Sequence, residues 1–303
     1  MTDPTDIRIP VAPRVQLHAR LWGTPGASRP SLLVHGLASN ARTWDGVAQQ
    51  LAEWGHPVAA IDQRGHGLSD KPDEGYDFPT LCADLLAVIE NLGWRGPEHK
   101  PVVVGQSWGG NVVLAFGSLY PDVPAALVLV DGGTIDLASA YPTWEETERL
   151  LAPPNLSGTP VVDFERRVRR GHLDWPEAGI EGTLANMEVL SDGTIAPHLS
   201  RAHHMTILKQ LWLQHPEDLY PKVQVPVLIV PATGGWSAGD PEPKQRATDA
   251  AVARLARAEV HWMEGDHDLH AQHPRQIAEL IQRAAGLAGA DPGSEPITDR
   301  RHA

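Results

Sequence analysis

The chain has 303 residues, 42% of them hydrophobic and 21% charged, so it can bury a large core as one α/β domain, alone or with a subdomain. Its formal net charge is −13, and its one basic cluster, residues 166–170, is typical of a solvated helix face, which argues against nucleic acid as a partner. The single cysteine, Cys82, excludes an intramolecular disulfide and is compatible with a reducing compartment.

The chain also lacks the sequence signals of secretion and membrane insertion. Its N-terminal segment has neither a basic start nor an apolar core, so we predict no signal peptide. No apolar run approaches the ~18 residues that a membrane helix needs. These features predict a cytoplasmic protein that does not bind membranes.

Short apolar runs alternate with helical patterns in the first 130 residues, which predicts a mostly parallel sheet with flanking helices. The expected strands here are 15–22, 31–35, 57–61, 102–104 and 126–130, with helices at 43–54, 78–92 and 111–120.

The alternation stops after residue 133 and returns near residue 222. Residues 134–221 lack a clear buried strand and are expected to form a helical cap, with helices at 143–151, 162–171, 180–190 and 200–214. The core is therefore predicted to comprise residues 1–133 and 222–287, and the polar residues 288–303 a flexible tail. The second core segment is expected to contain strands 225–230 and 260–263 and helices 243–258 and 274–285.

A nucleophile elbow is predicted at residues 105–109, whose sequence Gly-Gln-Ser-Trp-Gly lies between a β-branched strand and a helix. The turn is too tight for side chains at its flanks, which explains the two glycines. Ser107 would then be exposed at the carboxyl end of the sheet, at a helix N-terminus whose amides favour developing negative charge. This setting makes Ser107 the candidate nucleophile.

A serine hydroxyl attacks at neutral pH only when a base takes its proton, and a carboxylate usually orients that base. The chain has 15 histidines, and in the order Ser-Asp-His the base follows the last strand. His267 lies in the loop after the expected strand 260–263 and is the predicted base, with His270 and His273 as neighbouring alternatives.

Two aspartates are candidates for the acid that orients His267. Asp240 is the first carboxylate after the expected strand 225–230 and is preferred, although the loop before it is long. Asp131 follows strand 126–130 at the same sheet edge as Ser107 and is the alternative. A structural role at that edge would also explain Asp131.

The oxyanion of an acyl-transfer intermediate needs two amide donors. The amide of Trp108 follows the nucleophile, and Leu37, in the loop after strand 31–35, is the expected second donor. We interpret His35 as a residue that braces this loop. The glycine-rich segment 62–69 lacks the spacing of a nucleotide site, so it is expected to be a turn that braces the sheet edge.

In four segments the chain resembles the α/β-hydrolase superfamily: 35–36, 62–69, 105–109 and 265–267. The resemblance covers nearly the whole chain outside the tail. It implies an eight-stranded, mostly parallel sheet with a helical cap. It also implies the nucleophile at Ser107, the base at His267 and oxyanion amides at Leu37 and Trp108. The family's acid usually follows the penultimate strand, which favours Asp240, but some relatives place it after the strand beside the nucleophile, as Asp131 would be.

These features predict a serine hydrolase, an esterase that acts through an acyl-enzyme on a small or medium apolar ester. A C–C bond hydrolase, a lactonase or a cofactor-free perhydrolase would use the same triad. A small-molecule binding protein without catalysis is the alternative from another class. No histidine, cysteine or carboxylate spacing is typical of a metal site, so neither a metal nor an organic cofactor is expected.

Overall fold

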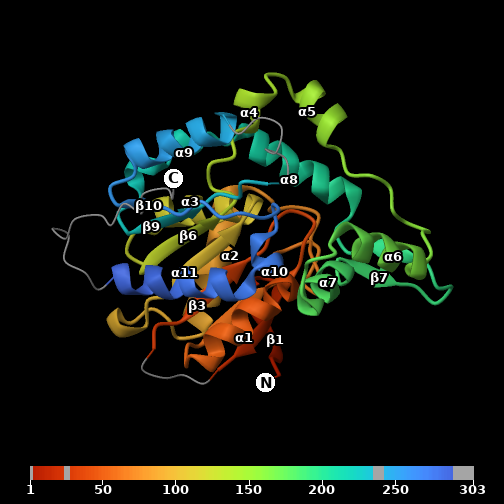
Figure 1. Cartoon of the computed structure of the whole chain (residues 1–303), viewed down its shortest axis with the longest axis horizontal. Helices are drawn as coiled ribbons and strands as arrows, with labels where there is room; N and C mark the ends of the chain where they lie inside the picture. Colours follow the sequence, from red (N-terminus) through yellow and green to blue (C-terminus); the bar gives the residue numbers. More distant parts are fainter. Residues whose placement is uncertain (1–2, 24–27, 235–241, 289–303) are drawn as a thin grey trace.

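A single eight-stranded sheet crosses the computed structural model, which describes residues 3–23, 28–234 and 242–288. The strand order is β1-β2-β4-β3-β5-β6-β9-β10 (Figure 1). β2 pairs antiparallel with β1 and with β4, and all other pairs in this sheet are parallel. The predicted mostly parallel eight-stranded sheet is thus confirmed. The strands are β1 (Thr5–Ala12), β2 (Val15–Trp22), β3 (Ser31–Val34), β4 (Val58–Ile61), β5 (Val102–Gln106), β6 (Ala126–Val130), β9 (Val227–Val230) and β10 (Ala258–Val260).

The central strands are apolar throughout because both faces of the sheet are covered. Successive side chains of a strand point to opposite faces. Accordingly, Leu32 and Val34 enter one core cluster, and Leu33 enters the other. β5 and β6 divide their side chains in the same way, which explains why these runs lack an alternation of polar and apolar residues.

Helices cover both faces of the sheet (Figure 1). Buried side chains of α2 (Phe78–Asn91), α3 (Trp108–Leu119) and α9 (Glu242–Arg254) belong to one cluster. Those of α1 (Asp45–Glu53) and α11 (Pro274–Leu287) belong to the other. The shorter elements η1 (Ala41–Trp44), η2 (Pro97–His99) and α10 (Leu269–Gln272) connect strands to these helices.

The segment between β6 and β9 extends to one side of the core (Figure 1). It contains α4 (Leu137–Ala140), α5 (Trp144–Leu151), α6 (Val161–Gly171), α7 (Glu177–Leu184), α8 (Arg201–Leu213), η3 (Pro216–Asp218) and η4 (Tyr220–Lys222). It also contains the hairpin of β7 (Met187–Val189) and β8 (Ile195–Pro197). A small cluster that includes Phe164, Trp175 and Ile180 packs this segment against Ala271 of the core.

Three sequence predictions differ from the structure. The expected helix 180–190 ends at Leu184, because the following residues pair with β8 around a turn at Gly193, where φ is +81°. The last strand lies at 258–260 instead of 260–263, and only a bridge between Ala232 and Met263 continues the pairing. The antiparallel β1 was not predicted.

Within the described ranges, no helix combines the length and the apolar character that crossing a membrane requires.

Candidate active site

Ser107 lies at the junction of β5 and α3 with φ +54° and ψ −126°, a conformation that L-residues rarely adopt. This backbone conformation lowers the stability of the fold by about 1–3 kcal/mol, so it persists only where the surrounding structure imposes it. A Cβ at Gly105 would lie 2.2 Å from the Gly109 carbonyl oxygen, so strand and helix approach too closely for side chains there. The Ser107 amide donates to the Val130 carbonyl at 3.0 Å. The sharp turn predicted from the glycines is therefore present.

His267 and Asp131 form a hydrogen-bonded pair at the same sheet edge. His267 Nδ1 lies 2.5 Å from Asp131 Oδ2. The other carboxylate oxygen, Oδ1, accepts from the Ala232 amide at 2.9 Å and from Lys244 Nζ at 2.6 Å. The Asp131 side chain is 5% exposed and that of His267 is 24% exposed. The imidazole therefore reaches the surface of the site while its acid lies beneath it.

The two groups shift each other's pKa in opposite directions. Burial alone would raise the pKa of Asp131, but the hydrogen bond and charge of His267, with the charge of Lys244, lower it below its usual value. Burial alone would lower the pKa of His267, but the hydrogen bond and charge of Asp131 and the charge of Asp268 raise it. The pair thus favours an ionised carboxylate beside a more basic imidazole.

Of the two acids proposed from the sequence, the alternative, Asp131, contacts His267. Asp240, the preferred residue, lies outside the described residues. The neighbouring histidines lie elsewhere. His270 is 1% exposed and packs on the Trp44 ring with centroids 4.3 Å apart, and burial lowers its pKa to about 3. His273 directly precedes the first residue of α11.

Gln106 and Gly36 bring the serine turn, the histidine loop and the loop after β3 together. Gln106 Nε2 donates to the His267 carbonyl at 3.1 Å, so the residue before Ser107 holds the histidine loop. A Cβ at Gly36 would lie 2.4 Å from Gln106 Oε1 and 3.1 Å from the Ser107 Cβ. The loop that carries Leu37 therefore packs directly on the serine turn.

The loop after β3 is held by two neutral histidines. His35 Nδ1 donates to the Gly36 carbonyl at 2.7 Å and its Nε2 accepts from the Gln63 amide at 3.0 Å, which confirms the expected bracing role. His66 Nε2 accepts from the amide of Ala38, whose φ is +60°. Burial lowers the pKa of both imidazoles. In the described part of the chain, neither the Leu37 nor the Trp108 amide donates to another group, so both can serve a ligand oxygen.

The segment 62–69 braces the sheet edge, as expected. Asp62 accepts from the Ala41 amide at 2.7 Å and the Leu68 amide at 2.8 Å, and it binds His18 Nδ1 at 2.8 Å. Arg64 forms two 2.6 Å hydrogen bonds to Asp84, and both side chains are 4% exposed. These charges are paired inside the protein and are not available to a phosphate.

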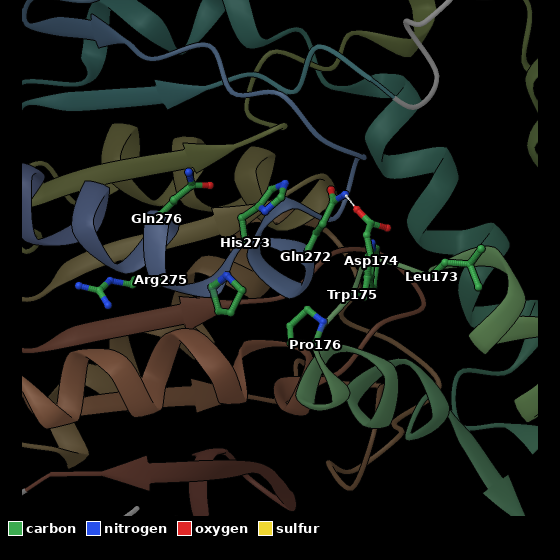
Figure 2. A pocket seen from close by; sticks show the side chains of 9 residues that line it. Leu173, Asp174, Trp175, Pro176, Gln272, His273, Arg275 and Gln276 are labelled. Carbon is green, nitrogen blue, oxygen red and sulfur yellow. Dashed lines mark hydrogen bonds between the residues drawn. The ribbon is translucent and has the colours of Figure 1, made fainter.

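A pocket of about 530 Å³ lies where residues 173–176 meet residues 272–276 (Figure 2). Gln272 joins the two sides, because its Nε2 donates to Asp174 at 2.5 Å (Figure 2). Its Oε1 accepts from the Asp266 amide at 2.7 Å. The segment between β6 and β9 is thereby tied to the residue that precedes His267.

Sequence reasoning missed Lys244, Gln106 and Gln272. Lysine and glutamine side chains are usually solvated. Gln106 ends strand β5, whereas Lys244 and Gln272 lie on helices, and residue type alone marks none of the three as internal. Their partners lie between 6 and 161 positions away in the chain. Only the folded arrangement identifies them.

Residues 32–280 match the model of the alpha/beta hydrolase family. The chain is 33% identical over 283 residues to an uncharacterized protein of Mycobacterium tuberculosis, which covers 88% of this chain and 78% of that protein. It is 38% identical over 130 residues to a serine hydrolase-like protein of Danio rerio, but this match covers 42% of the chain and only 37% of that protein.

Among solved structures, that of E-2-(acetamidomethylene)succinate hydrolase superposes with a TM-score of 0.77 at 22% identity, over 93% of this chain and 99% of that one. At this identity the likeness shows the shared fold. The family model spans the sheet from β3 to β10, the serine turn and the histidine loop. The chain is therefore an enzyme of the hydrolase type and belongs to the alpha/beta hydrolase family.

Proposed function

We propose that the protein is a carboxylic ester hydrolase in which Ser107, His267 and Asp131 form the catalytic triad. The observation that carries this proposal is the 2.5 Å hydrogen bond between His267 Nδ1 and Asp131 Oδ2, at the edge where the strained serine turn lies. The contact between Gln106 and the histidine loop supports it, because it places the two loops side by side.

In the proposed mechanism, His267 Nε2 takes the proton of Ser107 as its Oγ attacks the ester carbonyl carbon. The Leu37 and Trp108 amides donate hydrogen bonds to the carbonyl oxygen and stabilise the negative charge that develops on it. The imidazolium returns the proton to the departing alcohol, which leaves an acyl-enzyme. His267 then takes a proton from a water molecule as its oxygen attacks the acyl carbon. The bond from that carbon to Ser107 Oγ breaks, and the imidazolium returns the proton to Oγ, which releases the carboxylic acid and restores the enzyme. Asp131 stays ionised throughout, and these steps require no metal or organic cofactor.

We propose a small or medium apolar ester as substrate. The side chains that α8 packs towards the core are apolar, and they join the cluster that contains Trp108, the residue after the nucleophile. The members of α8 in this set are Met205, Ile207, Leu208, Leu211 and Trp212.

Hydrolysis of short-chain p-nitrophenyl esters tests the function. Ser107→Ala should lower kcat by roughly 10⁴-fold or more, because the nucleophile is lost. Ser157→Ala, at an exposed serine between β6 and β9, is the matched control and should retain wild-type turnover. A fluorophosphonate should transfer its phosphonyl group, with loss of fluoride, to the wild type and the control but not to Ser107→Ala, which mass spectrometry of the intact protein detects.

Turnover that survives in Ser107→Ala would disprove the mechanism. An active-site serine that reacts with fluorophosphonate without ester turnover would direct attention to lactones, β-diketones and peracid formation, which the same triad could handle. Saturable binding of such compounds without any turnover would instead support a binding protein.

A further inference from the structure

Lys244 points inward, although lysine side chains usually reach solvent. It lies in the first turn of α9, and its side chain is 20% exposed. Its Nζ donates to Asp131 Oδ1 at 2.6 Å and to the Ala232 carbonyl at 2.9 Å. The ammonium group therefore bridges the carboxylate beside His267 and the chain that follows β9.

The two oxygens of Asp131 have separate partners. Oδ2 faces His267, whereas Oδ1 receives the Lys244 ammonium and the Ala232 amide. Asp131 itself has φ +42°, so its backbone is held in a rarely occupied conformation. The contacts on Oδ1 fix the rotation of the carboxylate and thereby keep Oδ2 directed at the imidazole.

We infer that Lys244 is a positioning residue of the active site, which orients Asp131 towards His267 and places a positive charge behind the pair. The inference rests on the proposed triad and adds a fourth side chain to it. Lys244 contacts the carboxylate of Asp131, and it acts on His267 through that carboxylate.

The charges around Asp131 and His267 determine whether loss of the Lys244 charge raises or lowers the pKa of His267. Asp131 faces His267 and Lys244, and His267 faces Asp131, Asp268 and Lys244. Asp268 in turn faces His172 and Asp266. The two carboxylates favour the imidazolium, whereas the ammonium opposes it. Removal of the ammonium charge should therefore raise the pKa of His267 further.

The test compares Lys244→Met, which removes the charge at similar volume, with Lys244→Arg, which keeps it. The His267 pKa is read directly by NMR of ring-labelled histidine, with His267→Asn identifying the resonance. We expect a rise of roughly one pH unit in Lys244→Met, the usual scale for loss of a nearby charge. The acidic limb of the kcat/KM profile should move by the same amount, and kcat/KM at neutral pH should fall roughly tenfold. Lys244→Arg should stay near wild type.

Lys222→Met, at an exposed lysine outside the site, is the matched control and should change neither reading. An unchanged His267 pKa together with unchanged kcat/KM in Lys244→Met would overturn the inference, and so would a Lys244→Arg protein as defective as Lys244→Met. If Lys244→Met does not fold, Lys244→Gln takes its place. Because the NMR reading needs no substrate, it stands even if the ester assay fails, so the two failures can be told apart.

Discussion

Two buried aspartates each bind a histidine next to the sheet, and their surroundings differ. Asp62 binds His18 Nδ1 at 2.8 Å, and Asp131 binds His267 Nδ1 at 2.5 Å. His18 lies on strand β2, is 8% exposed, and also binds Asp6 through its Nε2 at 3.0 Å. His267 lies on a loop and is 24% exposed.

The first pair joins the turn after β4 to a neighbouring strand and uses both nitrogens of its imidazole within the fold. The second lies at the edge of the serine turn, and a lysine supports it from behind. An Asp–His hydrogen bond is thus no evidence of catalysis by itself. Its place relative to a nucleophile and its access to solvent decide what it can do.

The largest expected effect is a loss of turnover when the Asp131–His267 pair is disrupted. Asp131→Asn should reduce kcat by about 10³- to 10⁴-fold, because the amide no longer orients and stabilises a protonated His267. Asp240→Asn is the matched control and should stay within severalfold of wild type. Steady-state kinetics with a p-nitrophenyl ester measure both; a larger loss in Asp240→Asn would assign the acid to Asp240 instead.

The complementary change, Asp62→Asn, should act on stability. It weakens the bond to His18 inside a buried site, so the free energy of unfolding should fall by roughly 3 kcal/mol. The folded fraction should keep its kcat. Urea denaturation together with active-site titration measures the two quantities, and a stable protein with lost turnover would contradict the division of roles.

The pH dependence of the stability that His18 contributes and the pH dependence of kcat/KM that His267 causes should have opposite signs. Burial lowers the pKa of His18, but Asp62 and Asp6 outweigh it and raise the pKa above 6.5. The contribution of His18 to stability is therefore complete below pH 6.5 and is lost as pH rises through its folded-state pKa. His267 also has a raised pKa but must be neutral to act, so kcat/KM should fall as pH drops through that value.

Chemical denaturation and kinetics across pH 5 to 9, roughly the range in which histidines titrate, measure both profiles. The His18→Gln protein should lose the part of the stability change that His18 contributes, read as the difference from the wild-type profile, but keep the change in kcat/KM. Retention of both profiles in that variant would show that His18 does not cause the first.

The smallest effect concerns the support of the histidine loop. His18 is held by its strand, whereas the loop of His267 depends on side chains such as Gln272, which accepts from the Asp266 amide. Gln272→Met should lower kcat/KM severalfold and the free energy of unfolding by about 2 kcal/mol, the scale of the two hydrogen bonds that it removes, to the Asp266 amide and to Asp174. Gln276→Met, at an exposed residue of the same pocket, is the control. Equal effects of the two substitutions would show that these two bonds are not responsible.

Much of the core could be predicted from the sequence because the central strands are buried on both faces and therefore read as short apolar runs. β6 was placed at its observed bounds, and α2 to within one residue. β1 was missed although Ile7, Ile9 and Val11 alternate with exposed residues and pack on one core cluster, because Pro10 interrupts the run and proline is uncommon inside a strand. β7 was read as the end of a helix because the stability of its hairpin with β8 comes from pairing across a turn, which a helical periodicity does not reveal.

In the candidate site too, some features follow from the local sequence and others only from the tertiary structure. The sequence alone determined Ser107 and the two loops beside it, because a tight turn needs its glycines and a strand needs its apolar run, and both are local requirements. Only the tertiary structure brought Asp131 to His267 across 136 positions and Lys244 to Asp131 across 113. Hydrogen bonds between loops depend on where parallel strands end relative to one another, and strand order in a sheet is set by packing, which no local pattern encodes.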